Sequence, residues 1–106
     1  MLNEENKKLC WAVLTKFGIR NQRLMVVEEC AELIKAVCKL FRAMTAGHLE
    51  NYIEEIVDVI VMCQQILLSE RITMDEVNKR AKAKLERALN EDTKEADNEV
   101  LPFTTD

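Results

Sequence analysis

The chain has 106 residues, with 15 Lys and Arg against 19 Asp and Glu, and a single domain is expected at this length. Its two glycines and one proline are too few for the hairpin turns of a β-sandwich or the glycine-rich loops of a Rossmann unit or a P-loop NTPase. Because 48% of the residues are hydrophobic and 32% are charged, the composition predicts a globular, all-α protein.

Charge and hydropathy also limit the partners of the chain. The formal net charge is −4, and the excess of acid comes from the stretch between Asn90 and Asp106. Without a strongly basic surface, binding to a nucleic acid polymer or to an anionic membrane is not expected. No apolar run approaches the roughly 18 residues of a membrane span, and the first residues lack the order of a signal peptide. We therefore expect a cytoplasmic protein.

Four helices are predicted in chain order. The first covers about residues 3–17 and ends at Gly18, a residue suited to a left-handed C-terminal cap. The second covers about 21–44 and stops at the break in 45–47, and the third covers about 48–70. The fourth covers about 73–89 and begins where Thr73 and Glu76 have capping-box spacing. We expect residues 1–91 to form one domain and 92–106 an acidic tail, either disordered or packed on a neighbour.

Cysteine and histidine give little sign of chemistry. Cys10, Cys30, Cys38 and Cys63 are far apart and form no C-x-x-C pair, which indicates small buried residues in a reducing compartment rather than zinc ligands. His48 is the only histidine, and nothing in the sequence pairs it with a cysteine as the base of a nucleophile. We expect His48 simply to lie at the start of the third helix.

Both central helices are apolar on two sides when each residue is rotated by about 100°. In the second helix, a stripe typical of a core contains Leu24, Val27, Ala31, Ile34 and Cys38. A further apolar group surrounds Glu29 on the opposite side: Met25, Leu33, Ala36, Leu40 and Met44. The third helix has one stripe of Ile53, Ile56, Val57, Ile60 and Leu67, and a second of Val59, Met62 and Ile66. A lone bundle cannot cover both sides, so we expect a second subunit to cover these helices.

Acidic residues interrupt these apolar helices at helical spacing. Glu29 and Glu32 share one face of the second helix, and Glu55 and Asp58 share one face of the third. Carboxylates in apolar surroundings cannot all ionise unless a cation lies among them, and oxygen ligands without His or Cys favour Mg²⁺, Mn²⁺ or Ca²⁺. A di-iron bundle is not expected, because it needs Glu-x-x-His on two helices. The alternative is a set of solvated acids paired with bases such as Lys35.

With Glu28, these acids form E-E-x-x-E followed, after 22 residues, by E-x-x-D. Over about residues 20–90, this pattern resembles the signature of the MazG-like branch of the all-α nucleoside triphosphate pyrophosphohydrolases. The resemblance implies a four-helix MazG-like domain whose two central helices pack in a homodimer or a dimer of dimers. It also implies Mg²⁺-dependent hydrolysis of a nucleoside triphosphate to the monophosphate and pyrophosphate, with Mn²⁺ as a possible substitute, in nucleotide-pool house-cleaning.

The resemblance assigns catalytic roles to all five acids: Glu28, Glu29, Glu32, Glu55 and Asp58. It makes Glu29, Glu32, Glu55 and Asp58 the metal ligands. Glu28 is rotated by about 100° from Glu29, so it would position a water molecule or make an outer contact. The metal is needed because a triphosphate is itself strongly negative and would be repelled by acids alone.

Substrate contacts are expected on two other helices. Lys84 and Arg87 in the fourth helix match a family segment, Lys-aromatic-x-x-Arg, so the resemblance implies that they bind phosphates. Lys82 departs from the pattern, because relatives often have Asn there. Trp11 is a candidate for stacking on the base, with a place in the core as the alternative. The alternative function is a catalytically silent nucleotide-binding or protein-interaction module on the same scaffold.

Overall fold

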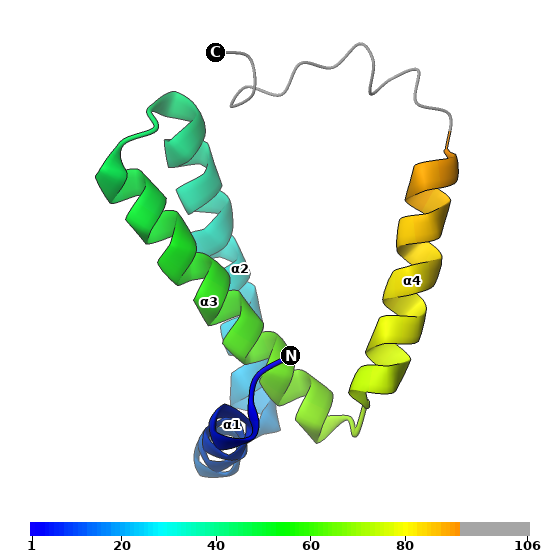
Figure 1. Cartoon of the computed structure of the whole chain (residues 1–106). Coiled ribbons are helices and arrows are strands. Elements are labelled where there is room, and N and C mark those ends of the chain that lie inside the picture. Colours follow the sequence, from blue (N-terminus) through cyan, green and yellow to red (C-terminus); the bar gives the residue numbers. More distant parts are fainter. Residues whose placement is uncertain (92–106) are drawn as a thin grey trace. The chain divides into compact units, whose positions relative to one another are not determined.

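A computed structural model describes residues 1–91 of the chain, which contain four α-helices and no strand (Figure 1). The helices are α1 (Glu4–Phe17), α2 (Ile19–Arg42), α3 (Ala46–Ser69) and α4 (Met74–Asn90). The predicted all-α class is confirmed, and every predicted helix end lies within two residues of the observed one. The predicted acidic tail, residues 92–106, lies outside the described residues.

Local chemistry explains why the first helix begins and ends where it does. The Asn3 side chain accepts a hydrogen bond of 2.9 Å from the backbone N–H of Asn6, which caps the start of α1. At the other end, Gly18 has a φ of 84° and donates its N–H to the carbonyl of Leu14 at 2.8 Å. Glycine adopts this left-handed conformation without steric cost, so α1 can end and α2 can begin one residue later.

The turn between α2 and α3 lies slightly earlier than predicted. Thr45 accepts a hydrogen bond of 3.1 Å from the backbone N–H of His48 and so caps the start of α3. Because of this cap, Gly47 lies in the first turn of α3 and not in the break. The His48 Nδ1 atom lies 2.8 Å from the carbonyl oxygen of Ala43, which closes the turn.

The chain divides into two units, residues 1–72 and the part from Thr73 onward, which are described separately. In the first unit, α2 and α3 form an antiparallel hairpin and α1 packs against both near the start of α2 (Figure 1). The backbone N–H of Leu2 donates to Gln64 Oε1 at 3.0 Å and ties the start of the chain to α3. The prediction of one domain over residues 1–91 stays a prediction.

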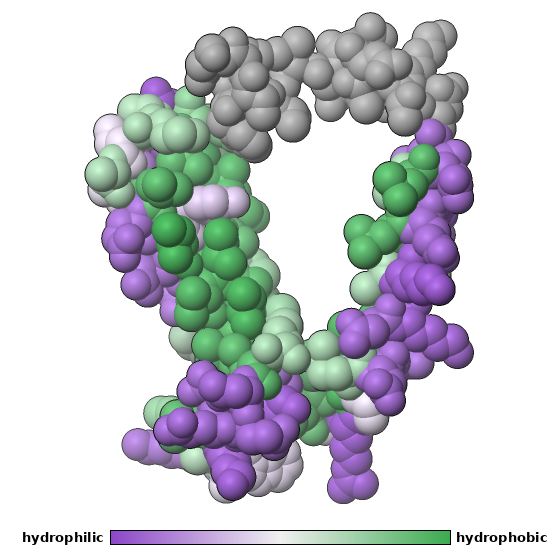
Figure 2. Space-filling view, viewed as in Figure 1, coloured by the Kyte–Doolittle hydropathy of each residue, from purple (hydrophilic) through white to green (hydrophobic). Residues whose placement is uncertain are grey.

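Helix α4, in the second unit, is amphipathic, with an apolar side and a hydrophilic side (Figure 2). Its start is capped by Thr73, which accepts a hydrogen bond of 3.2 Å from the backbone N–H of Glu76, as the capping-box spacing predicted. The Glu76 carboxylate also accepts a hydrogen bond of 3.0 Å from Arg80 Nε, an (i, i+4) pair that supports the helix.

The face of α2 that packs against α3 is not the one predicted to form the core. The side that contains Glu29 packs against α3, with Ala36 fully buried and Leu33 half-buried. The stripe predicted as a core is exposed in this unit: Leu24, Val27 and Ile34 are 57%, 67% and 64% exposed. That assignment was wrong because both sides of α2 are apolar, and helical periodicity alone cannot select the one that meets α3.

The cysteines are less uniformly buried than expected. All four are free thiols, and Cys10 is buried and Cys30 half-buried, but Cys38 and Cys63 are exposed in this unit. Burial raises the pKa of the Cys10 thiol, which makes it a poor nucleophile. Cys38 belongs to the same exposed stripe of α2 as Ile34, so the same error explains its placement.

None of the four helices found in residues 1–91 has both the length and the apolar composition that a bilayer span requires.

Candidate functional site

Carboxylates from two helices meet on the packed side of the α2–α3 hairpin. One side-chain oxygen from each of Glu29, Glu55 and Asp58 lies within 4.8 Å of the others. Glu29 and Glu55 are half-buried and Asp58 is exposed, so the cluster is open to solvent on one side. The antiparallel hairpin is what brings α2 and α3 acids together, because each helix presents its acids on the face that meets the other.

The negative charges of the neighbouring acids act on Glu29. Burial raises the pKa of the Glu29 carboxyl group, and the negative charges of Asp58 and Glu55 raise it further. A hydrogen bond with Asp58 and the charge of Glu32 act in the same direction. Glu29 therefore holds its proton more readily than an isolated glutamate does, because burial and neighbouring negative charges both disfavour its ionised form.

Among the described residues, the cluster has a buried oxygen without a hydrogen-bond partner and no positive charge paired with it, and a divalent cation would supply both. The Oε2 atom of Glu55 is buried and has no hydrogen-bond partner among the described residues. Within residues 1–91, no ion pair involves Glu29, Glu55 or Asp58. A metal ion would supply both the missing partner of the oxygen and the missing positive charge. Three carboxylates with no nitrogen or sulfur ligand suit a hard ion such as Mg²⁺ or Mn²⁺.

The remaining predicted acids lie beside the cluster. Glu32 is exposed and pairs with Lys35, with 3.5 Å between Glu32 Oε1 and Lys35 Nζ, and its charge reaches Glu29. Glu28 is exposed and lines a neighbouring cleft. The structure thus gathers three of the five predicted acids, places Glu32 next to them and turns Glu28 toward a different feature.

That cleft lies between α1 and α2 and has a volume of about 480 Å³. Its apolar walls are Val13, Phe17, Leu24 and Met25, and its polar groups are Asn21, Gln22 and Glu28. Among these residues, only Glu28 was predicted from the sequence as a site residue. The position of Gln22 could have been predicted from spacing. It precedes Glu29 by seven residues, or two helical turns, so its amide lies on the same packed face of α2.

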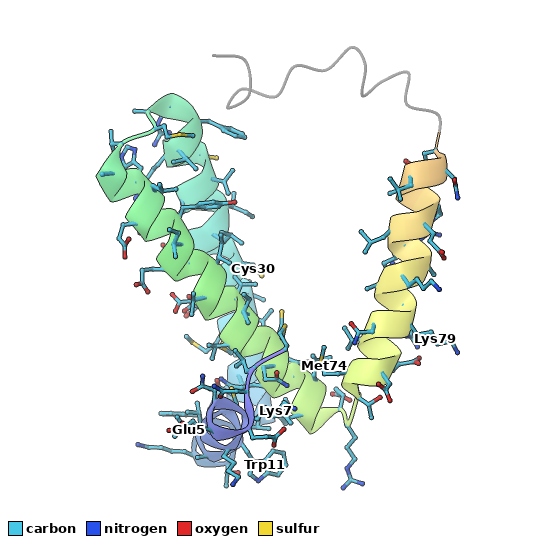
Figure 3. All side chains as sticks on the ribbon, viewed as in Figure 1. Glu5, Lys7, Trp11, Cys30, Met74 and Lys79 are labelled. Atoms are coloured by element: carbon cyan, nitrogen blue, oxygen red, sulfur yellow. The ribbon has the colours of Figure 1, made fainter. Side chains whose placement is uncertain are left out.

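The candidate substrate residues lie elsewhere. Trp11 is exposed on α1, does not line the cleft, and points away from the α2–α3 hairpin (Figure 3). The alternative, a place in the core, is therefore wrong for this unit, and stacking on a base stays a prediction. Lys84 and Arg87 are exposed on α4, in the second unit, and their role in phosphate binding also stays a prediction.

No protein-family model matches the chain, and neither the curated proteins nor the solved structures include a significant match. The resemblance to the MazG-like pyrophosphohydrolases therefore rests on the acidic motif and on the Lys84–Arg87 segment.

Proposed function

We propose that the chain is a Mg²⁺-dependent nucleoside triphosphate pyrophosphohydrolase of the MazG-like type, which converts a (deoxy)nucleoside triphosphate and water to the monophosphate and pyrophosphate. The observation that carries the proposal is the convergence of Glu29, Glu55 and Asp58, with one buried oxygen of Glu55 left without a partner. These residues occupy motif positions of the resemblance.

In this proposal, Glu29, Glu55 and Asp58 hold Mg²⁺, and Glu32 joins them by turning away from Lys35. When bound, the metal supplies the positive charge that polarises the phosphate and lowers the pKa of the attacking water. The side chains of the protein position the metal and the water. The half-buried carboxylates keep the ligand oxygens in place, and exposed Glu28 accepts a hydrogen bond from the water that attacks.

The finer architecture belongs to the same proposal. A second copy of the chain covers the exposed stripe of α2, which begins at Leu24 and includes Val27 and Ile34. Large exposed aliphatic side chains gathered along one helix face are typical of a protein interface. The resemblance also assigns phosphate binding to Lys84 and Arg87.

The test is pyrophosphate release from a panel of canonical and modified (deoxy)nucleoside triphosphates, with Mg²⁺ and with EDTA. We expect metal-dependent release, with the monophosphate as the second product in equal amount. Release of orthophosphate in place of pyrophosphate, or equal rates in EDTA, would contradict the proposal. The absence of pyrophosphate release from every nucleotide of the panel would also contradict the proposal, provided that light scattering and circular dichroism show a folded protein.

The exposed apolar stripe of α2 favours a second candidate, a helical interaction module whose acids have no catalytic role. The two candidates differ in their response to metal. The enzyme requires the acid cluster to bind Mg²⁺, whereas the interaction module keeps its partner affinity in EDTA. Titration of the metal-free protein with Mn²⁺, followed by paramagnetic broadening of NMR signals near Glu29, separates them without any assay of turnover.

A further inference from the structure

Helix α1 has an exposed ridge formed by Glu5, Leu9, Val13 and Lys16, called the α1 ridge below. These residues are spaced by four, four and three positions, so they lie along one face of the helix. Leu9 and Val13 are 59% and 38% exposed although both are aliphatic. Glu5 and Lys16 are exposed at the two ends. The ridge therefore consists of two aliphatic side chains between an acid and a base.

The α1 ridge is not the side by which α1 packs in the first unit. The buried residues of α1 are Cys10 and Leu14, which are rotated by about 100° and 140° from Leu9. Trp11 projects from yet another side of the helix than Glu5 does (Figure 3). The ridge is thus a separate surface, which the packing of α1 against α2 and α3 leaves open.

A groove lies beside the α1 ridge, between α1 and α3. Its volume is about 370 Å³, and Leu9 and Val13 form part of its wall, opposite Val57 and Val61 of α3. Of the seven residues that line it, only Asn6 is polar. A groove without convergent polar groups suits an aliphatic side chain better than a polar small molecule. A ridge and an apolar groove side by side are what a second helix needs in order to pack there.

The charges of the α1 ridge indicate a second copy of the chain as the partner. Trp11 marks the level midway between Leu9 and Val13, and Glu5 and Lys16 lie six residues before and five residues after it. If two α1 helices run antiparallel about a two-fold axis at this level, Leu9 of each copy faces Val13 of the other. Glu5 of each copy then comes within about one residue of the level of Lys16 of the other.

Both charged residues are available for this contact. Within residues 1–91, neither Glu5 nor Lys16 takes part in an ion pair. The ammonium group of Lys16 lies 5.3 Å from the centre of the Phe17 ring, which holds it at the end of the ridge. A parallel pair would bring like charges together, so the charges select the antiparallel arrangement.

We propose that α1 is a self-association surface, on which two copies of the chain pair their α1 helices antiparallel, with Leu9 of each copy packed against Val13 and the groove of the other. A two-fold interface requires a surface that is complementary to itself, and the ridge, the groove and the opposite end charges provide this. The inference does not depend on catalytic activity. It adds a second interface to the exposed stripe of α2, so dimers formed through that stripe associate further into tetramers.

The α1 interface should be the weaker of the two. Helix α1 has 14 residues and is therefore about 21 Å long. One pair of such helices buries less surface than the roughly 1,200–2,000 Å² of a stable protein interface. We therefore expect this association at concentrations between micromolar and millimolar, above those at which the stripe of α2 is covered.

The experiment is sedimentation equilibrium of the full-length chain from micromolar to millimolar concentration. The average mass of the wild type should double over this range. Leu9→Asp places a charge on the exposed ridge and should abolish the doubling, with helicity unchanged in circular dichroism. Lys8→Glu is the matched control, because Lys8 is exposed on α1 but rotated by about 100° from Leu9, and it should associate like the wild type. A constant mass of the wild type, or equal association of Leu9→Asp, would overturn the proposal.

Charge reversal tests the antiparallel arrangement. Glu5→Lys and Lys16→Glu should each weaken the association by about tenfold, because the two-fold axis turns two attractive contacts into two repulsive ones. The double variant, Glu5→Lys with Lys16→Glu, restores opposite charges across the pair and should associate like the wild type. A double variant that is no stronger than the single variants would contradict the proposed pairing.

Two further outcomes identify what covers the ridge. If Leu9→Asp lowers the melting temperature at micromolar concentration and leaves the association unchanged, another part of the same chain covers the ridge and the proposal fails. If Ile34→Asp, which alters the stripe of α2, still doubles its mass at high concentration, the α1 interface acts independently of that stripe. The two interfaces can therefore fail separately.

Discussion

The two long faces of α2 show opposite departures from the usual distribution of residues. The face packed against α3 contains Glu29 and Gln22, polar groups in a place where aliphatic residues are normal. The opposite face is exposed and contains Leu24, Val27 and Ile34. One helix thus has polar side chains toward its own chain and apolar ones toward solvent.

The difference indicates two separate roles. Acids gathered at the hairpin, with Glu55 Oε2 buried and without a partner among the described residues, lower the stability of a monomer, and a bound cation would offset that cost. Exposed aliphatic residues gathered along one helix face are typical of a protein interface. The packed face is therefore the candidate site, and the exposed face is the candidate interface, and substitutions on each should have different consequences.

The largest effect is expected at the acid cluster. Asp58→Asn removes a charged metal ligand while preserving the shape of the side chain, so turnover should fall by more than about 100-fold with helicity unchanged. The measurements are pyrophosphate release and circular dichroism. The matched control is Glu54→Gln, which neutralises an exposed acid beside Glu55 and should retain wild-type activity. Activity of Asp58→Asn above about a tenth of wild type would argue against a metal-ligand role.

A substitution on the other face should affect assembly more than chemistry. Ile34→Asp places a charge in the centre of the exposed stripe, where burial against a second copy would require desolvating it. We expect the dimer of the wild type to become a monomer at micromolar concentration in multi-angle light scattering. Lys8→Glu, a charge change at an exposed position of α1, should leave the dimer intact. A wild type that is itself a monomer at this concentration would refute the interface.

The smallest effect concerns the pH dependence of stability. Because the Glu29 pKa is raised on folding, the folded chain binds more protons than the unfolded chain between the ordinary and the raised pKa. Stability should therefore fall as the pH rises through that interval, and the loss should persist above it. In EDTA at pH 7, Glu29→Gln should raise the melting temperature by a few degrees.

Two additions sharpen this measurement. Mg²⁺ should stabilise the wild type more than Glu29→Gln, since the ion compensates a charge that the variant lacks. Glu54→Gln, the same chemical change at an exposed position, should not alter the pH profile. A Glu29→Gln variant that melts below the wild type in EDTA would show that the carboxyl group is stabilising and would contradict the like-charge explanation.

Several parts of the fold follow directly from local sequence. Gly18 ends α1 because its φ is positive, and Thr73 begins α4 because its hydroxyl accepts from the N–H three residues later. The spacing of Glu55 and Asp58 places both on one helix face, whatever surrounds them. These features depend on neighbours within one or two turns, which is why they could be predicted.

The candidate site depended partly on information that the sequence does not contain. Spacing indicated that Glu29 and Glu55 could converge, but not that Glu28 would line a cleft formed with α1. Phe17 and Gln22 line that cleft because α1 packs across the start of α2. No periodicity within a single helix specifies that packing.

By itself, the sequence determined four helices, their caps and the helix faces on which the acids lie, because backbone hydrogen bonding and the 3.6-residue period act locally. Only the tertiary structure decided which apolar face of α2 meets α3 and which stays exposed. Both faces contain aliphatic side chains, so an apolar pattern alone does not distinguish them. Helices α1 and α3 pack against the side of α2 that contains Glu29. This packing brings the acids together at the hairpin and leaves the apolar stripe on the other side exposed.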